Sequence, residues 1–183
     1  MSQQRDTDYL AISARIHAME NRLLTRERME RMIEAKEDSD ATKILVECGY
    51  GELTRLNLAE LETLIAQNRA ELFQDMKNAV PQRAAVEIFQ LQYDYHNAKV
   101  LIKSNKNGKD PLPLLVGGGR YQGETLHSNF ARDELGDVTA QFKHAVFEAK
   151  ESLSSTNDPQ QVDFILDRAC FAEMEFLAKS TEK

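Results

Sequence analysis

The stretch Phe89-Gln-Leu-Gln-Tyr-Asp-Tyr-His-Asn-Ala-Lys-Val-Leu-Ile-Lys-Ser104 decides how the rest of the chain is interpreted. It is long enough for a helix and apolar on nearly all sides, which indicates burial against more than one neighbour. Asp94, His96 and Asn97 nevertheless lie in its middle, where a buried polar group is costly unless it is hydrogen-bonded. These residues must therefore either pair with another element or carry out chemistry.

Two interpretations of these polar residues follow from helical geometry. Asp94 and Asn97 lie one turn apart and project together, with Leu101 continuing that face, whereas His96 lies on an adjoining face. The first interpretation is a polar clamp, in which the side chains bond to backbone or side-chain partners on a neighbouring helix. The second is a metal-binding or catalytic site, with His96, Asp94 and Glu20 gathered in a core pocket.

Length and composition predict an all-α protein. The chain has 183 residues, enough for one domain of ordinary size or one and a fraction, and for a core without disulfides. It contains 8 Gly and 4 Pro, with 42% hydrophobic and 29% charged residues, as an ordered and helix-rich protein would. The β-branched residues never gather into strand-like runs, so no sheet is expected.

Charge and cysteine content exclude several classes of protein. The net charge of −7 argues against nucleic-acid binding, which needs a concentrated basic surface, and weakly against docking to anionic lipid. Cys48 and Cys170 lie in apolar helical patterns, which favours buried free thiols in a reducing compartment over a disulfide or a catalytic thiol. No apolar leader and no run of about 18 apolar residues occurs, so we expect a cytoplasmic protein without a membrane span.

The N-terminal part of the chain shows the pattern of three short helices. Apolar residues step at helical spacing from Tyr9 to Leu23, which predicts an opening amphipathic helix. Thr25 is suited to cap a second helix, Ser39 or Asp40 a third, and Gly49 can end the third in a left-handed conformation. The second helix is expected to face inward through three apolar residues: Met29, Met32 and Ile33.

Two longer helices are predicted next. Asn57 and Glu60 form a pair similar to a capping box, which opens a fourth helix. Pro81 suits the first turn of the fifth helix, because proline fixes φ and the amide it lacks has no partner there. The fifth helix contains the stretch from Phe89 to Ser104. We therefore expect residues 1–108 to form a first helical module.

A change of composition follows this module. Residues 109–123 contain prolines and a run of glycines that no regular element tolerates, so they are expected to connect two modules. Residues 124–183 would form a partial second module. Its pattern predicts one helix over 130–152 and a last amphipathic helix capped by Asp158, with Pro159 at its first position.

No assembled catalytic or cofactor-binding signature is present in the sequence. Gly117-Gly-Gly-Arg120 lacks the Lys, the glycine spacing and the preceding strand of a phosphate-binding loop, so it is interpreted as a flexible turn. A nucleophile elbow, Gly-x-Ser-x-Gly, does not occur. The four histidines are His17, His96, His127 and His144. No two of them have the i, i+3 or i, i+4 spacing of a helical metal site. The spacing thus gives no sign of a metal site, and a site assembled only in three dimensions stays open.

Four segments, in order along the chain, resemble the C subunit of the bacterial and archaeal V/A-type ATPases, the relative of the eukaryotic V-ATPase d subunit. Tyr93 to Lys103 is similar to the family's Asp-x-x-Asn-x-(Lys)-x-Leu-(Leu/Ile)-(Lys/Arg) helix. Tyr9 to Thr25 resembles its Ala-Arg-Ile-Arg-x-x-Glu-x-x-Leu-Leu opening, and Cys48-Gly-Tyr-Gly51 its Gly-Tyr-Gly. Asp163 to Phe171 is similar to a later Asp-x-x-Leu-Asp-(Arg/Lys)-x-x-(Phe/Tyr) motif.

The resemblance implies a mechanical role. Family members are funnels of three antiparallel helical modules around a pseudo-threefold axis. They sit on the membrane rotor ring, receive the foot of the central shaft and couple rotation to proton or sodium transport. The resemblance implies a non-catalytic protein without a cofactor, cytoplasmic and peripheral to the membrane. It makes five residues of the Tyr93 to Lys103 helix a structural motif: Asp94, His96, Asn97, Lys99 and Lys103.

One departure from the family concerns length. Family members are considerably longer, so the chain is expected to correspond to the N-terminal portion, with an incomplete funnel. Two other hypotheses are kept beside the rotor-coupling one. The first is a helical metal protein or enzyme with a core Asp/His site, and the second is a helical adaptor of unspecified partner.

Overall fold

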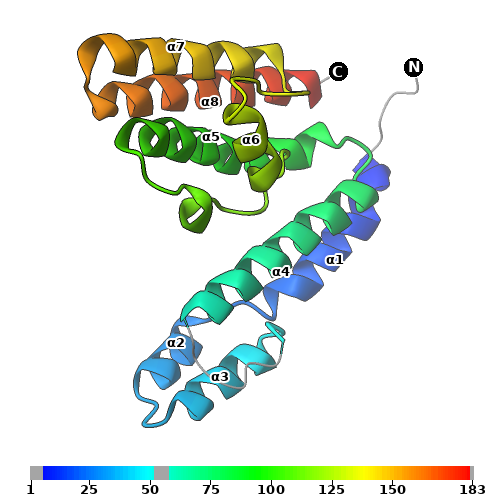
Figure 1. The fold of residues 1–183 in the computed structure, drawn as a ribbon. Coiled ribbons are helices and arrows are strands. Elements are labelled where there is room, and N and C mark those ends of the chain that lie inside the picture. Colours follow the sequence, from blue (N-terminus) through cyan, green and yellow to red (C-terminus); the bar gives the residue numbers. More distant parts are fainter. Residues whose placement is uncertain (1–5, 52–57, 182–183) are drawn as a thin grey trace. The chain divides into compact units, whose positions relative to one another are not determined.

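Helices form all the regular structure in the computed structural model, which describes residues 6–51 and 58–181 (Figure 1). No strand occurs within those ranges, and the prediction of an all-α fold is confirmed. None of the helices described there is both long enough and apolar enough to cross a bilayer. The chain divides into two compact units, Met1–Pro81 and Gln82–Lys183, which are considered separately below.

In the described residues of the first unit, 6–51 and 58–81, there are four α-helices and a short 3-10 helix. α1 packs against α4, and α2 packs against α3 (Figure 1). Among the residues described there, the buried apolar side chains come from α1, α3 and the residue after α3: Ile12, Ala41, Ile44, Leu45 and Cys48. The elements are η1 (Asp6–Tyr9), α1 (Leu10–Glu20), α2 (Arg26–Ile33), α3 (Asp38–Glu47) and α4 (Leu58–Ala79).

Helix ends in this unit follow the sequence signals in part. Thr25 caps α2, because its hydroxyl oxygen accepts a hydrogen bond from the Arg28 amide at 3.3 Å, as predicted. Gly49 follows α3 with φ of 84°, in the left-handed region where glycine is unstrained. The prediction for the start of α3 is wrong by two or three residues, since the residue that precedes the helix is Glu37 and not Ser39 or Asp40. The proposed cap at Asn57 lies outside the described residues.

The prediction that α2 faces inward is wrong at two positions. Met29 is 45% exposed and Ile33 is 83% exposed. They lie one turn apart on a helix of eight residues that buries none of them fully. Helical spacing thus identifies the helix, but no element in the described part of this unit covers the apolar side that these two residues share.

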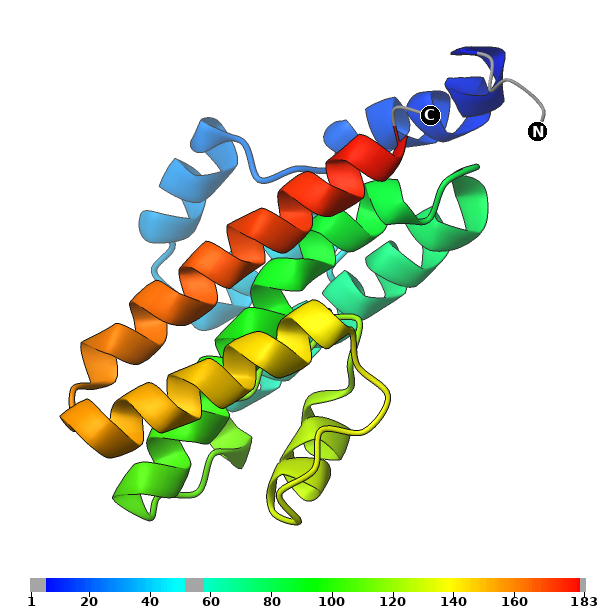
Figure 2. The ribbon, with the colours of Figure 1, turned by 90° about the horizontal axis from the view of Figure 1, so that it is seen from above.

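The second unit is built on three long helices whose axes lie side by side (Figures 1 and 2). α8 packs along both α5 and α7, and α6 packs against α5. The link of two residues between α7 and α8 makes them an antiparallel hairpin. The elements are α5 (Ala84–Asn107), η2 (Leu112–Leu114), α6 (Gly123–Phe130), α7 (Ala140–Thr156) and α8 (Pro159–Thr181).

Two helix predictions in this unit are wrong. α5 begins at Ala84 after Arg83, so Pro81 precedes its first turn. The single helix predicted over 130–152 begins only at Ala140, because a loop follows the end of α6 at Phe130. That loop contains Asp133 and Gly136, with φ of 57° and 71°, and positive φ is incompatible with a continuing right-handed helix.

Other helix ends in this unit agree with standard capping chemistry. Thr139 opens α7, its hydroxyl oxygen accepting from the Phe142 amide at 3.3 Å. The predicted Asp158–Pro159 start of α8 is confirmed, and the Asp158 carboxylate accepts from the Gln160 amide at 2.9 Å.

The division at Pro81 does not coincide with the predicted connection at residues 109–123. α5 lies within the first expected module, 1–108, but it packs against α7 and α8, which belong to the expected module of 124–183. Residues 109–123 run within the second unit and return along α5. The apolar surface of α5 explains this grouping, because burying it requires the two helices that follow.

Candidate functional site

The functional residues suggested by the sequence lie on α5, around a core that α5 shares with α7 and α8. The rings of Tyr95 and Phe142 meet edge to face with their centroids 5.1 Å apart, and Tyr121 packs on Phe142 at 5.3 Å. Leu91 and Leu166 are fully buried beside them. This apolar setting shields the polar groups that border it from bulk solvent.

Asp94 is completely buried in this setting and accepts two hydrogen bonds. Its Oδ2 accepts from Nε of Arg120 at 2.8 Å, and its Oδ1 accepts from the amide of Tyr121 at 3.1 Å. Arg120 also donates through Nη1 to Oε1 of Glu173 at 3.0 Å. The side chains of Asp94, Arg120 and Glu173 are 0%, 9% and 1% exposed, so one buried guanidinium lies between two buried carboxylates.

Glu173 extends this network to two further elements. Its Oε2 accepts from the phenol of Tyr95 at 2.7 Å, and its Oε1 accepts from the hydroxyl of Thr139 at 2.9 Å. The network of Asp94, Arg120, Glu173, Tyr95 and Thr139, hereafter the Arg120 network, therefore joins α5, the loop before α6, the start of α7 and α8. Each carboxylate has at least two donors, which a buried charge requires.

The protonation states of the Arg120 network follow from burial and charge. Burial raises the pKa of Asp94 to about 6, although the bonds from Arg120 and Tyr121 oppose this rise. Burial disfavours the charged form of Arg120, but the two carboxylates outweigh it and raise its pKa. Burial, with the Glu173 carboxylate, raises the pKa of Tyr95, which keeps this phenol a donor. At neutral pH the ion pair is the favoured state, because both Asp94 oxygens face donors.

The glycine run before Arg120 allows the loop to approach α5 closely. Gln90 on α5 donates through Nε2 to the carbonyl oxygens of Gly118 and Gly119, at 3.0 and 3.1 Å. A Cβ on Gly119 would lie 2.2 Å from Oδ1 of Asp94, which no side chain tolerates. The glycines thus serve close packing against α5, a role that the interpretation as a flexible turn does not include.

Asn97 holds the same loop at a second point. Its Nδ2 donates to the carbonyl of Val116 at 2.9 Å, and its Oδ1 accepts from the amide of Val116 at 2.8 Å. Asp94 and Asn97 therefore project together from α5, but their direct partners belong to the loop of residues 116–121. The clamp interpretation places these partners on a neighbouring helix. Asp94 is linked to such a helix, α8, only indirectly, because Arg120 bonds to both Asp94 and Glu173.

The remaining motif residues lie on other sides of α5. His96 is exposed, with Nε2 3.3 Å from the carbonyl of Leu114. Lys99 and Lys103 pair with Asp167 and Asp163 on α8, each at 2.6 Å. The residue numbers rise on α5 while they fall on α8, so the two helices run antiparallel.

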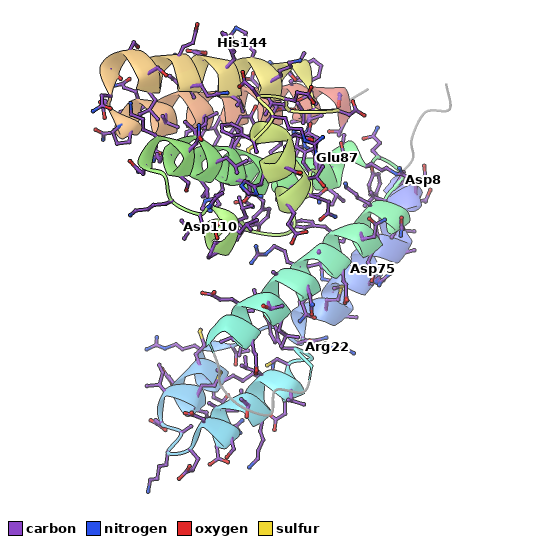
Figure 3. The ribbon with its side chains drawn as sticks, viewed as in Figure 1. Asp8, Arg22, Asp75, Glu87, Asp110 and His144 are labelled. Atoms are coloured by element: carbon purple, nitrogen blue, oxygen red, sulfur yellow. The ribbon has the colours of Figure 1, made fainter. Side chains whose placement is uncertain are left out.

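Asp94 and His96 of the rival site do not lie together. Asp94 and His96 face different sides of α5, and Glu20 belongs to the first unit, where it pairs with His17 at 2.9 Å. His144 points outward from α7 and is 82% exposed (Figure 3). Within residues 6–51 and 58–181, no three or more His, Cys, Asp or Glu side chains form a group that could hold a metal ion.

Comparison with known proteins identifies the family. The family model described as ATP synthase (C/AC39) subunit matches residues 12–183. The chain belongs to this family, the C subunits of the V/A-type ATPases. It is 24% identical over 173 residues to the C subunit of the V-type sodium ATPase of Enterococcus hirae, covering 94% of this chain and 53% of that protein. It thus spans about half the length of this relative. No solved structure matches significantly.

Sequence reasoning missed several members of the Arg120 network in this member of the C/AC39 family. Glu173 gives a usable signal, because it continues the apolar stripe of Val162 and Leu166 on α8, where a charged residue implies a buried partner. Arg120 gives none, since it follows a glycine run in a loop. Tyr95 belongs to the stretch that is apolar on nearly all sides, but the partner of its phenol could not be inferred.

The two cysteines are buried and free. Burial raises the pKa of Cys170 to about 11, and the nearby carboxylates of Asp167 and Glu173 act in the same direction. The thiolate is the reactive form of cysteine, so Cys170 is unreactive at neutral pH.

Proposed function

We propose that the chain acts in the central stalk of a V/A-type rotary ATPase, where it couples the rotor shaft of the soluble head to the membrane rotor ring. The observation that carries this proposal is the family match over residues 12–183. The relative from Enterococcus hirae belongs to a sodium ATPase by its name, and the proposed complex would carry protons or sodium ions. The chain would lie at the cytoplasmic side of the membrane, as a peripheral part of the complex.

The proposed role is mechanical and non-catalytic. A coupling protein must transmit torque between two partners without yielding, which requires a body with few internal degrees of freedom. The Arg120 network and the bonds of Asn97 fix the loop of residues 116–121 to α5, and reach α7 and α8 through Glu173. Both network carboxylates are buried and bonded, so neither presents a free oxygen to a substrate. We assign the structural motif of α5 to this rigidity.

The shape implied by the family is part of the proposal. We expect the helical units to be arranged around a pseudo-threefold axis in the complete protein, with the funnel receiving the shaft. Because the chain spans about half the length of its relative, the ring and shaft contacts are proposed for the full-length gene product.

Binding to purified partners tests this role. The full-length gene product, immobilised at low ionic strength, should retain both the shaft proteins and the detergent-solubilised rotor ring. The matched control is the catalytic head without its shaft, which should pass through. Retention of neither the shaft nor the ring at low salt would reject the proposal.

The alternative of a helical metal protein or enzyme is not favoured, because Asp94 is engaged by Arg120 and Tyr121 while His96 faces another side of α5. Elemental analysis of the purified protein distinguishes the two. Stoichiometric zinc, iron or manganese would support the alternative over the coupling role. A helical adaptor of another complex would instead show binding to neither the ring nor the shaft.

A further inference from the structure

Two polar atoms of the site are buried without a hydrogen-bond partner in the described part of the chain. They are Oε1 of Gln90, an acceptor, and Nη2 of Arg120, a donor. Gln90 is 4% exposed and the Arg120 side chain is 9% exposed. Buried polar atoms of folded proteins are nearly always bonded, to protein or to ordered water.

The bonding around the two atoms fixes their orientation. Gln90 donates through Nε2 to the carbonyls of Gly118 and Gly119, which a flipped amide could not do, so Oε1 is the free end. Nε and Nη1 of Arg120 are taken by Asp94 and Glu173, which leaves Nη2 as the free donor.

Local connectivity places both side chains in the same small region. Arg120 directly follows Gly119, whose carbonyl Gln90 holds at 3.1 Å. Asp94, which binds Nε of Arg120, lies one helical turn beyond Gln90 on the same side of α5. Both side chains are therefore anchored on the same loop and the same side of one helix.

The chemistry of the two atoms selects the ligand. It must donate to an amide oxygen and accept from a guanidinium N–H. An anion is disfavoured by the carboxylates of Asp94 and Glu173, and a metal cation is disfavoured by the donor of Arg120 that faces it. Water is small enough and does both, and buried waters typically bond to about three protein atoms.

We propose that one water molecule is bound between Oε1 of Gln90 and Nη2 of Arg120 as a permanent part of the Arg120 network. The water gives the Arg120 side chain a second attachment to α5, besides Asp94. It also completes the hydrogen bonding of the loop at the point where Gly119 approaches α5 most closely. This site is independent of the rotor-coupling role.

A crystal structure of the chain at about 1.5 Å resolution tests the site, together with two matched variants. Gln92→Met removes the same amide from an exposed position of α5, where it bonds to the carbonyl of Phe89, and should keep the water. Gln90→Met removes the acceptor and should lose this water. Electron density within hydrogen-bond distance of both atoms supports the site. Direct protein partners for both atoms, or a water that contacts one of them alone, would overturn it.

A measurement in solution keeps the test independent of the variants. In the wild-type chain, the amide protons of Gly119 to Tyr121 or the guanidinium protons of Arg120 should show cross-relaxation with a water that resides longer than about a nanosecond. Cross-relaxation with rapidly exchanging surface water alone would contradict the site.

Discussion

An arginine–aspartate pair joins different segments in each unit of the chain, and the two pairs differ sharply in setting. In the first unit, Arg15 of α1 meets Asp75 of α4 at 2.5 Å, with the side chains 50% and 56% exposed. In the second, Arg120 meets Asp94 at 2.8 Å, with exposures of 9% and 0%. Water screens the first pair, so it contributes little to stability. The second is desolvated, so its loss leaves an uncompensated buried charge.

The same contrast extends to the helices that carry the two pairs. α1 buries Ile12 alone and α2 buries no residue, whereas α5 is buried along most of its length. The second unit therefore specifies its arrangement through a polar network inside an apolar core. The first unit has a thinner core, and Leu23 and Ile33 remain exposed in it. We conclude that buried ion pairs and hydrogen bonds fix the arrangement of the second unit, whereas the Arg15–Asp75 ion pair of the first unit lies at the surface and contributes little to its structure.

The largest expected effect is that of Arg120→Met. It leaves the carboxylates of Asp94 and Glu173 buried without a cation, which should lower the free energy of unfolding by about 3–5 kcal/mol. Arg15→Met, the control in the first unit, should cost about 0–1 kcal/mol. Urea denaturation followed by circular dichroism measures both. Equal costs for the two variants would remove the distinction between the units.

Asp94→Ala should have a smaller effect, because Arg120 keeps Glu173 as its partner. The amide of Tyr121 and Nε of Arg120 lose their acceptor, which should cost about 1–3 kcal/mol. Asp75→Ala on α4 should change stability by less than about 1 kcal/mol. If equilibrium denaturation of Asp94→Ala matches the wild type, Asp94 is solvated and does not act as a clamp.

Gly119→Ala tests the close approach of the loop to α5. The added Cβ would lie 2.2 Å from Oδ1 of Asp94, so the loop or the helix must shift, at a cost of about 1–3 kcal/mol. Gly123→Ala is the control, since its Cβ would meet its nearest neighbours at 3.4 Å or more. Thermal unfolding should separate the two variants, and a Gly119→Ala protein as stable as Gly123→Ala would show that the contact is loose.

The last effect concerns pH. The folded-state pKa of Asp94 is raised from 3.8 to about 6, so the folded chain binds this proton more tightly than the unfolded chain. The stabilisation from Asp94 is fully present below about pH 4 and is lost as the pH rises through about 6, by at most about 3 kcal/mol. The difference in unfolding free energy between wild type and Asp94→Asn should therefore fall over this window.

Asp133 provides a control of opposite sign for the pH experiment. Its hydrogen bond to Lys150 at the surface lowers its pKa, so its contribution is present above about pH 4 and is lost as the pH falls. The difference between wild type and Asp133→Asn should shrink on acidification. The same slope in both variants would mean that burial does not control the titration of Asp94.

Local signals in the sequence predict much of the fold. Thr25, Gly49 and Asp158 mark helix ends through capping bonds that involve neighbouring residues, and these predictions are confirmed. The prediction of one helix over 130–152 is wrong, because its apolar spacing continues through a loop that Asp133 and Gly136 create. Periodicity reports which residues are apolar, and it does not report where the backbone turns.

The network itself is only partly visible in the sequence. Asp94 and Asn97 stand out because they are polar residues on an apolar helix, and both are buried and bonded. Their partners Val116, Arg120 and Tyr121 lie 19–27 residues away in a loop, and the sequence does not encode which residues of the loop these are. Such contacts form only when the core brings the loop to the helix, so the sequence indicates the need for partners without identifying them.

Backbone hydrogen exchange of single residues tests the central claim, that the Arg120 network holds the loop to α5. The amide of Tyr121, which donates to Asp94, should exchange slowly in the wild type and in Arg15→Met. In Arg120→Met it should exchange at least about tenfold faster, the equivalent of about 1.4 kcal/mol, while the amides of α1 keep their wild-type rates. A Tyr121 amide that exchanges as fast in the wild type as in Arg120→Met would contradict the account.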